Sequence, residues 1–378
     1  MQRLELKYFE SPSILLVTGS LEGGGAERVI SDMANYWADR GWHVTLATWS
    51  GPEIQDFFSL APNIGRIWLN VYSPNDSLVG KIRSNVGRII KLRKLLQASR
   101  PNVVLSFIDV SNVRTILAAS GLGVRVVVSE RTNPRLNYRV PRFWRALRRI
   151  SYSWADEVVA QTQDAARWIE TKCRVRVAVI PNALRVLPKV AREREFLIIA
   201  IGRLSNEKGF DILLRAFGRI SPDFKNWRLV IIGEGPDRPA LLQLRDNLGL
   251  RDRVELIGQV QDVETWLARA GLVVHPSRRE GFPNVVLEAM GMGAAVVCAN
   301  CHSGPSELIQ DGINGRLVPV DDVDTLARVM AELMANPDIR IRFGQEASRV
   351  RQHYEQSVVM QKWESCLSPK SVAYPDKQ

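Results

Sequence analysis

Short apolar runs alternate with longer amphipathic segments along the whole chain. The apolar runs predict strands at Ile14–Thr18, His43–Ala47, Val103–Phe107, Val124–Ser129 and Val158–Ala160, and then at Leu197–Gly202, Leu229–Gly233, Val254–Gly258, Leu272–His275, Ala295–Ala299 and Gly315–Val318. The amphipathic segments predict helices, most clearly at Ala26–Arg40, Ile212–Ile220, Ala240–Leu248 and Asp324–Ala335. Short apolar strands that alternate with helices are typical of parallel βαβ units.

Because the pattern runs through twice, it predicts an α/β fold of two doubly wound, Rossmann-like domains that face a central cleft. We expect residues 1–183 to form the first domain and residues 190–351 the second, joined by the Pro- and charge-containing linker Ala183–Glu195. The tail has a helical pattern, and residues 352–378 are expected to pack back on the first domain. Ligands of such sheets bind outside the carboxyl ends of the strands, so the loops there should line the cleft.

The composition is that of a globular protein, with 378 residues, 46% hydrophobic and 24% charged. No apolar run approaches the roughly 18 residues that cross a bilayer, and Met1–Ser13 lacks the apolar core of a signal peptide. We therefore expect a cytoplasmic protein whose membrane contact is peripheral. The four cysteines do not suggest a disulfide framework. The pair Cys298 and Cys301 has no second ligand pair nearby, so neither zinc nor redox chemistry is predicted.

Basic charge is concentrated in the first half of the chain. Residues 1–185 hold 26 Lys and Arg against 15 Asp and Glu, whereas residues 186–378 hold 25 of each. Two basic amphipathic segments predict contact with an anionic membrane or acceptor, through Lys81, Arg88, Lys91, Arg93, Lys94, Arg145, Arg148 and Arg149. The alternative is a pair of ordinary helices with their basic faces in water. No nucleic-acid partner is predicted.

The segment Glu280–Glu288 carries the strongest chemical signal. Glu280 precedes a turn-like Gly-Phe-Pro, and Asn284 is a candidate N-cap for an apolar helix that contains Glu288. The N-terminus of a helix attracts anions, so two carboxylates there could bind hydroxyls on either side of a phosphate. A nucleotide-sugar offers those groups in that order. A surface Glu and an ordinary helical Glu are the alternative reading.

Glycine-rich turns follow several of the predicted strands. Gly23-Gly24-Gly25 suits the approach of a phosphate, but Arg28 occupies the third glycine position of the dinucleotide fingerprint. The second strand ends in Thr48-Trp49-Ser50, without an acid for a ribose, which argues against a nicotinamide dehydrogenase. A tight turn without a ligand remains the alternative.

Further candidates lie in the second half. Arg203 and Lys208, in the turn that begins at Gly202, could neutralise a diphosphate, although exposed basic residues are common. Gly233-Glu234-Gly235 forms a similar turn. Asp322 and Asp324 have the spacing of a metal-diphosphate clamp, but they stand just before a helix, where Asp is a favoured cap. No metal site is predicted.

Together these residues resemble the family 4 retaining glycosyltransferases, which have the GT-B fold. The resemblance covers about residues 14–350, and its markers are Gly23–Arg28, Gly202-Arg203 with Lys208, Glu280–Glu288 and Ser303–Glu307. It implies that the second domain binds a nucleotide-sugar and the first an acceptor. It assigns catalytic roles to Glu280 at the donor sugar and to Arg203 and Lys208 at the leaving diphosphate. The remaining donor-binding residues would be Gly23, Gly24, Gly25, Gly202, Glu234, Phe282, Pro283, Asn284, Val285 and, at the ribose, Glu288. No metal or cofactor is implied.

One position departs from the family pattern. Many relatives carry His after the strand equivalent to Val124–Ser129, where this chain has Arg131, which cannot act as a base. Arg131 and Asp109 are therefore expected only to lie near the substrate.

The chain looks most like bacterial enzymes that assemble surface glycans or lipid-linked oligosaccharides. This implies a UDP-N-acetylhexosamine donor and a saccharide or polyprenyl-diphosphate-linked acceptor at the cytoplasmic face of the inner membrane. The alternatives are a nucleotide-sugar epimerase of the same fold and a non-catalytic protein that binds nucleotide-sugars or membranes.

Overall fold

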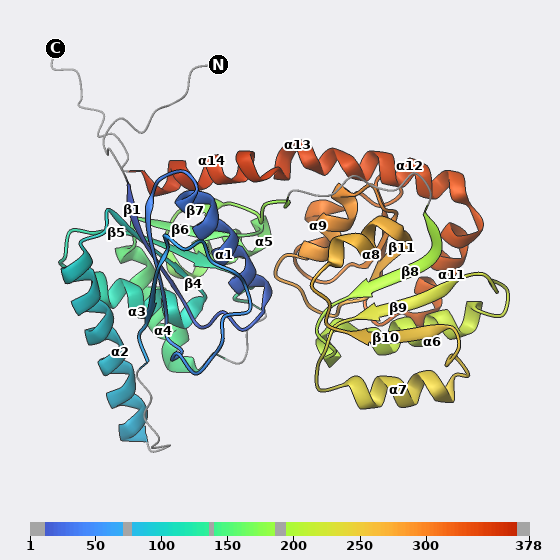
Figure 1. Ribbon diagram of the computed structural model, residues 1–378, viewed down its shortest axis with the longest axis horizontal. Coiled ribbons are helices and arrows are strands. Elements are labelled where there is room, and N and C mark those ends of the chain that lie inside the picture. The colour runs from blue at the N-terminus through green and yellow to red at the C-terminus, as the bar shows by residue number, and fades with distance from the viewer. Residues whose placement is uncertain (1–11, 71–77, 136–139, 186–193, 369–378) are drawn as a thin grey trace, which may run out of the picture. The chain divides into compact units, whose positions relative to one another are not determined.

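The computed structural model describes residues 12–70, 78–135, 140–185 and 194–368 (Figure 1). The chain forms two compact units. Unit 1 comprises Met1–Pro181 with Met360–Gln378, and unit 2 comprises Asn182–Val359. Each unit contains one parallel sheet, so the predicted α/β fold with two Rossmann-like domains is confirmed. Most of the predicted linker falls on residues 186–193, outside the described residues. Within the described segments, no helix is long and apolar enough to cross a bilayer.

The sheet of unit 1 has the strand order β3-β2-β1-β4-β5-β6-β7, and all neighbouring pairs are parallel. Its strands are β1 (Ser13–Thr18), β2 (His43–Thr48), β3 (Gly65–Trp68), β4 (Val103–Phe107), β5 (Arg125–Glu130), β6 (Glu157–Ala160) and β7 (Val177–Val179). Its helices are α1 (Gly25–Ala38), α2 (Leu78–Ser99), α3 (Asp109–Ala119), α4 (Arg142–Ser151), η1 (Tyr152–Trp154) and α5 (Gln163–Cys173).

The sheet of unit 2 has the strand order β10-β9-β8-β11-β12-β13 and is also parallel. Its strands are β8 (Glu195–Ile201), β9 (Arg228–Ile232), β10 (Val254–Gly258), β11 (Ala270–His275), β12 (Val296–Ala299) and β13 (Arg316–Val318). Its helices are η2 (Asn206–Lys208), α6 (Phe210–Ile220), α7 (Arg238–Asn247), α8 (Val263–Arg269), α9 (Asn284–Gly291), α10 (Pro305–Leu308), α11 (Val323–Ala335), α12 (Pro337–Ala347), η3 (Ser348–Val350) and α13 (Arg351–Tyr354).

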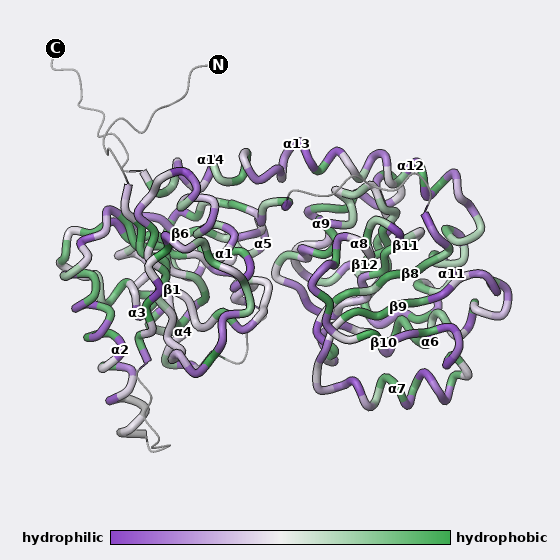
Figure 2. Tube along the Cα trace, viewed as in Figure 1, coloured by the Kyte–Doolittle hydropathy of each residue, from purple (hydrophilic) through white to green (hydrophobic). Residues whose placement is uncertain are grey.

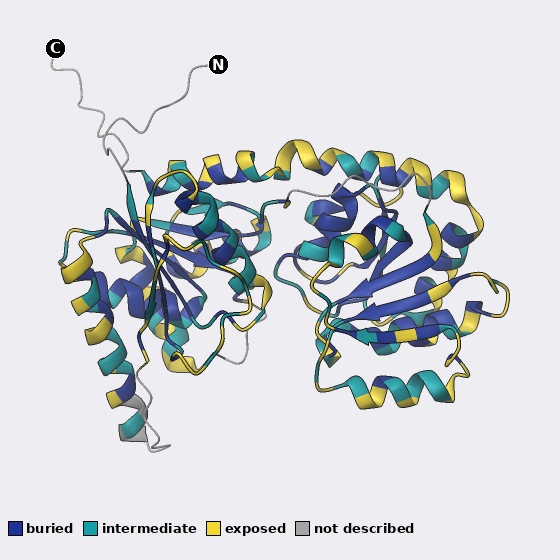
Figure 3. Cartoon of the chain, viewed as in Figure 1, coloured by how far each residue is buried: buried dark blue, intermediate teal, exposed yellow. Residues whose placement is uncertain are grey.

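The strands read as continuous apolar runs because both faces of each sheet are covered. Figure 2 shows hydrophobic residues along the strands, and Figure 3 shows that the same strands are buried while the outer helices alternate between buried and exposed positions. In unit 2, one core lies against α6 and α11 and a second lies against α8 and α9. Burial on both faces is the usual condition of a parallel sheet.

The last helix, α14 (Gln356–Leu367), contains the boundary between the units, which falls after Val359. The residues that follow complete the core of unit 1. Trp363 is almost fully buried, and the centroid of its ring lies 6.1 Å from that of Phe107 in β4. Arg125 of β5 donates from Nη2 to the Cys366 carbonyl oxygen at 2.9 Å. Unit 1 is thus built from the two ends of the chain.

Each sheet has a point at which the strand order reverses. In unit 1 the reversal lies between β1 and β4, and in unit 2 between β8 and β11. Crevices that bind ligands in open α/β sheets form at such points, outside the carboxyl ends of the strands. The loops after these four strands are therefore the first places to look for a site.

Candidate active site

The loops after β8, β9 and β11 meet, backbone against backbone, at the carboxyl edge of the unit 2 sheet. A Cβ on Gly233, at φ +140°, would lie 2.0 Å from the Gly202 carbonyl oxygen. A Cβ on Gly209, at φ +66°, would lie 2.2 Å from the Pro276 carbonyl oxygen. Only glycine allows such conformations and approaches without strain. These glycines let the three loops converge around Lys208.

Glu280 lies in a buried polar cluster formed by these loops. Its Oε1 accepts a hydrogen bond from Lys208 Nζ at 2.5 Å and lies 2.7 Å from His275 Nε2. Ser277 Oγ is 3.0 Å from the same His275 nitrogen. The side chain of Glu280 is 8% exposed and that of Lys208 is 24% exposed. His275 and Ser277 were not predicted, although the position of His275 at the end of a predicted strand could have indicated it.

The Glu280 carboxylate is ionised despite its burial. Burial alone would raise the pKa, because desolvation disfavours a charged carboxylate. The charge of Lys208, the contact with His275 and the hydrogen bonds to both outweigh burial and hold the pKa of Glu280 well below its ordinary value of 4.5. An ammonium has three N–H donors. Since Glu280 accepts one, Lys208 retains donors for a second anion.

Arg278 fixes the two loops that carry Lys208 and Glu280. Its guanidinium forms a bidentate pair with Asp211, both contacts at 2.8 Å, and donates from Nε to Asp321 at 2.6 Å. Its backbone N–H donates to the Glu207 carbonyl oxygen at 2.9 Å. Bidentate pairs of this kind impose a defined geometry. Arg203, by contrast, is exposed just beyond β8, and within the described part of the chain it forms no ion pair.

Helix α9 begins beside this cluster, but the predicted N-cap is wrong. Asn284 is the first helical residue, Pro283 precedes it as the cap, and no side chain caps the helix. The Asn284 side chain instead accepts a hydrogen bond from Asn182 Nδ2. Glu288 is buried within α9, and Phe282 is buried with its ring against Tyr354.

The remaining candidates of unit 2 have ordinary partners. Glu234 is half-exposed and pairs with Arg238 at 2.9 Å. Asp322 caps α11 by accepting from Thr325 N at 2.9 Å, as predicted, and Asp324 pairs with Arg219. The described residues include no cluster of three or more His, Cys, Asp or Glu that could hold a metal.

In unit 1, the glycine-rich loop and Asp109 lie beyond the two strands at the reversal point. Gly23 has φ +114°, and α1 begins directly after Gly24. Asp109 is buried at the start of α3, and the residue before it, Ile108, has φ 74°. Positive φ is rare for a β-branched residue and marks local strain, which is frequent at functional sites.

A buried charged cluster lies beyond β5. Glu130 accepts from Tyr152 Oη at 2.6 Å and from Arg148 Nη1 at 3.3 Å. Burial, with a further contribution from Asp109, outweighs the effect of Arg148 and raises the pKa of Glu130 to about 7. The prediction that Arg148 contacts a membrane is wrong, because its side chain is only 2% exposed and pairs with Glu130. The sequence pattern indicated an amphipathic helix around Arg148, but it did not indicate the buried acidic partner, Glu130.

Arg131 is also buried, unlike a solvent-facing cation. Its guanidinium carbon lies 4.4 Å from the centroid of the Phe107 ring, and burial lowers its pKa to about 9. The other predicted basic contacts differ in exposure. Lys91, Lys94 and Arg149 are exposed, whereas Arg88 and Arg145 are half-buried. Arg93 donates to the carbonyl oxygens of Ala118 and Ser120. The side chain of Lys81 lies outside the described residues.

Comparison with known proteins gives matches over both units. Residues 23–186 match the family model described as Glycosyltransferase Family 4, and residues 187–350 match the model described as Glycosyl transferases group 1. The two models together cover most of the chain.

The relatives with known names include two from Campylobacter jejuni subsp. jejuni serotype O:2. The first, GalNAc-alpha-(1->4)-GalNAc-alpha-(1->3)-diNAcBac-PP-undecaprenol alpha-1,4-N-acetyl-D-galactosaminyltransferase, is 27% identical over 93% of this chain and 96% of its own length. The second, N-acetylgalactosamine-N,N'-diacetylbacillosaminyl-diphospho-undecaprenol 4-alpha-N-acetylgalactosaminyltransferase, is 25% identical over 87% and 92%. Among solved structures, sucrose-phosphate synthase from Thermosynechococcus elongatus is similar in fold, with a TM-score of 0.79, 18% identity and coverage of 94% and 98%.

Proposed function

The chain belongs to the family 4 glycosyltransferases, and from this premise we propose that it transfers an N-acetylhexosamine or hexose from a UDP-sugar to a saccharide carried on a lipid diphosphate. The observation that carries the proposal is the Glu280–Lys208–His275 cluster at the strand-order reversal of unit 2. The cluster places a fixed carboxylate and a fixed cation side by side, as a donor sugar next to its diphosphate requires. The names of the two Campylobacter relatives support N-acetylhexosamine transfer and a lipid-diphosphate acceptor.

In the proposed reaction, the bond between the sugar C1 and the diphosphate breaks while the acceptor hydroxyl bonds to C1. Positive charge builds on the sugar ring and negative charge on the departing diphosphate. Lys208, Arg203 and the N-terminal end of α9 stabilise the diphosphate, because preorganised charges act where charge develops. The Glu280 carboxylate binds the donor sugar and holds Lys208 in position.

The proposed stereochemical outcome is retention by front-face attack. The acceptor hydroxyl gives its proton to an oxygen of the leaving phosphate, so no protein base and no metal is assigned to the step. Arg131 and Asp109 of unit 1 are proposed to lie near the substrate. The anomeric configuration of the product, read from its proton coupling, tests retention, since an inverted product would contradict this mechanism.

The donor is tested by thermal unfolding with a panel of nucleotides and nucleotide-sugars in metal-free buffer. A ligand that binds only the folded state stabilises it by about 2.7 kcal/mol at a hundred times its Kd. We expect a higher midpoint with UDP and with one UDP-sugar, and a smaller shift with UMP, which lacks the second phosphate. A shift with GDP- or ADP-sugars alone would change the proposed donor. If no nucleotide-sugar raises the midpoint, the proposed function is wrong.

We also propose that unit 1 docks on an anionic membrane through α2 and α4. These helices expose Val86, Ile90, Phe143 and Ile150 among basic residues. Arg114 of α3 links them, because it donates to Asn85 Oδ1 at 2.6 Å and lies 5.1 Å from the Trp144 ring centroid. Amphipathic helices of this composition bind at the interface of acidic bilayers.

Replacing both Lys91 and Lys94 by glutamine is expected to weaken binding to phosphatidylglycerol vesicles about thirtyfold, since each basic residue contributes about 1 kcal/mol at an anionic surface. Arg93 stays unchanged because it holds backbone carbonyls of α3 and the residue after it. The loss should shrink at high salt and should be absent with neutral phosphatidylcholine vesicles. Salt-independent binding by both proteins would contradict electrostatic docking.

A further inference from the structure

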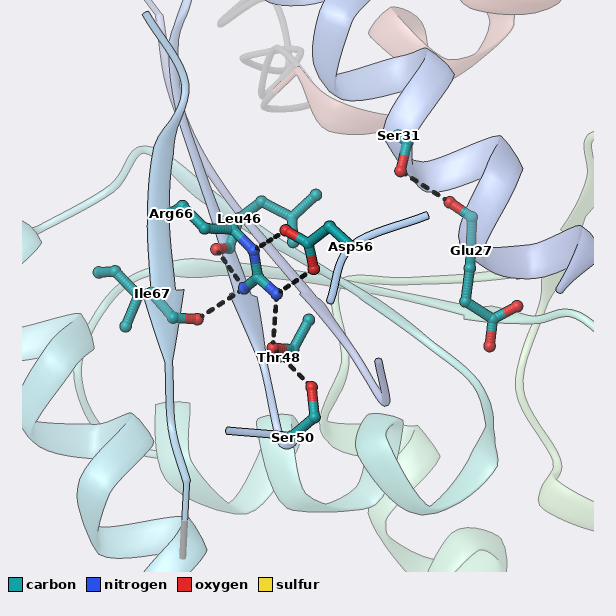
Figure 4. Close-up of polar contacts among 8 residues, drawn as sticks. All are labelled: Glu27, Ser31, Leu46, Thr48, Ser50, Asp56, Arg66 and Ile67. Carbon is teal, nitrogen blue, oxygen red and sulfur yellow. Dashed lines mark hydrogen bonds and ion pairs between the residues drawn. The ribbon is translucent and has the colours of Figure 1, made fainter. Parts of the chain in front are cut away.

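A second polar cluster lies at the carboxyl ends of β2 and β3 in unit 1, and none of the proposed steps uses it. Figure 4 shows the Arg66 guanidinium between the two strands, facing Asp56. Arg66 donates from Nε and Nη2 to the two Asp56 oxygens at 2.7 and 2.8 Å, and from Nη2 to Thr48 Oγ1 at 3.0 Å. Ser50 Oγ donates to the same Thr48 oxygen at 3.1 Å.

Two exposed aromatic rings border this cluster. Trp68 of β3 is 37% exposed, and the Arg66 guanidinium carbon lies 4.7 Å from its ring centroid. Phe57, next to Asp56 in the chain, is 47% exposed. Exposed aromatic side chains of this size have a large apolar area to offer a ligand.

Phe57 is held against the glycine-rich loop of unit 1. The backbone N–H of Phe57 donates to the Leu21 carbonyl oxygen at 2.9 Å. A Cβ on Gly23 would lie 3.3 Å from the Phe57 ring, so the ring and the glycine are in direct contact. The Arg66–Asp56 pair anchors the residue next to Phe57 in the chain. The cluster is therefore continuous with the reversal point of unit 1.

We propose that Phe57, Trp68 and Asp56 form a subsite for a sugar ring of the saccharide acceptor. The inference rests on the proposed function, in which unit 1 binds that acceptor. The apolar C–H face of a pyranose packs on an aromatic ring, while its hydroxyls need acceptors and donors at the edge. Asp56 has about four lone-pair positions, and Arg66 uses two of them, so acceptor capacity remains for sugar hydroxyls. Ser50, which is partly exposed, adds a hydroxyl.

The charges at this place favour a neutral, hydroxyl-rich ligand. The guanidinium of Arg66 is neutralised by a bidentate carboxylate, so little positive charge is left to attract a phosphate. A purely apolar ligand would exclude water from Asp56 and Ser50 without replacing the hydrogen bonds that water makes to their remaining lone pairs, which is costly.

The test measures binding of sugars without any nucleotide. The probes are the methyl α-glycosides of N-acetylgalactosamine, N-acetylglucosamine, galactose and glucose, followed by saturation-transfer NMR. We expect at least one to bind the wild type, and Phe57→Ala or Trp68→Ala to weaken its binding about tenfold through lost apolar contact. Phe57→Tyr and Trp68→Phe should restore most of the affinity. Phe196→Ala, which removes a 55% exposed ring from β8 of unit 2, is the matched control and should have no effect.

Transfer kinetics separate this subsite from the proposed function. With the acceptor of the wild-type reaction, Phe57→Ala and Trp68→Ala should raise the acceptor KM about tenfold, while the donor KM stays unchanged. An unchanged acceptor KM in the double variant overturns the subsite alone. Failure of all four glycosides to bind the wild type also overturns it. If no nucleotide-sugar raises the unfolding midpoint of the wild type, the proposed function is overturned. That result does not depend on whether the glycosides bind.

Discussion

Replacing Glu280 by glutamine is expected to lower kcat for sugar transfer by about a hundredfold or more, equivalent to roughly 2.7 kcal/mol of transition-state stabilisation. Glutamine keeps the size of the side chain and removes only the negative charge. The reason for the loss is that the ionised carboxylate, which we propose contacts the donor sugar where positive charge develops, also holds Lys208 at 2.5 Å. The measurement is steady-state transfer at saturating donor and acceptor.

The fold of this variant should survive, because Lys208 is partly exposed and its amine can turn to water. Circular dichroism and the thermal midpoint check this. Glu255→Gln, which changes an exposed acid on β10 of the same unit, is the matched control and should transfer at the normal rate. A Glu280→Gln enzyme with normal kcat would remove Glu280 from the catalytic set.

Lys208→Met and Arg203→Met are expected to lose similar amounts of transfer activity. Lys208→Met is expected to lose more stability than Arg203→Met. Both should lower kcat by about tenfold or more, because each removes a cation proposed to stabilise the leaving diphosphate. Breaking a buried ion pair costs roughly 3–5 kcal/mol, and the partial exposure of Lys208 reduces this to about 2 kcal/mol. Arg203 is exposed, so its replacement should change stability by less than about 0.5 kcal/mol. Denaturant unfolding measures both values.

The stability difference between wild type and Lys208→Met should depend on pH. In the wild type, the pKa of Glu280 lies below its unfolded value of 4.5, so its ionised form adds stability above that pH, and this is lost as pH falls. Without Lys208, burial is expected to raise the pKa of Glu280. Protonation of Glu280 at lower pH then removes the cost of a buried, unpaired carboxylate, so the variant becomes more stable as pH falls. The gap should therefore narrow as pH falls from 7, and should narrow further below about pH 4.5, where the wild type loses the contribution of ionised Glu280. A constant gap would show that the pair contributes through packing alone.

In unit 1, the sequence revealed the interior strands better than the edge strands. The interior strand β4 has the predicted bounds, because a strand covered on both faces must be a continuous apolar run. The edge strand β3 was not predicted. Its four residues, Gly65–Trp68, include Arg66, and only β2 pairs with it, so it needs no apolar run. The edge strand β7, Val177–Val179, was not predicted either, because three residues are too few to show a pattern.

The sequence predicted individual residues of the site, but not the contacts between them. Spacing indicated Glu280, and a glycine turn indicated Lys208, but the two are 72 residues apart and meet only because β8 and β11 are neighbours. The position of His275 at the end of a predicted strand could have marked it as a candidate, but did not show that it would contact Glu280. Arg148 was misassigned for the same reason, since its partner Glu130 lies on a different element.

The construction of unit 1 from both ends of the chain has a consequence for the order of events during synthesis. Its core includes Met360, Trp363 and Leu367, which are among the last residues that the structure describes. At about 5–20 residues per second, the 178 residues of Asn182–Val359 separate these side chains from the rest of unit 1 by roughly 9–36 s. Of the two units, unit 1 thus starts to emerge from the ribosome before unit 2 and is completed after it. Until translation reaches α14, the apolar surface beside Phe107 that Trp363 covers in the folded protein stays exposed. That exposed surface is a natural binding site for chaperones.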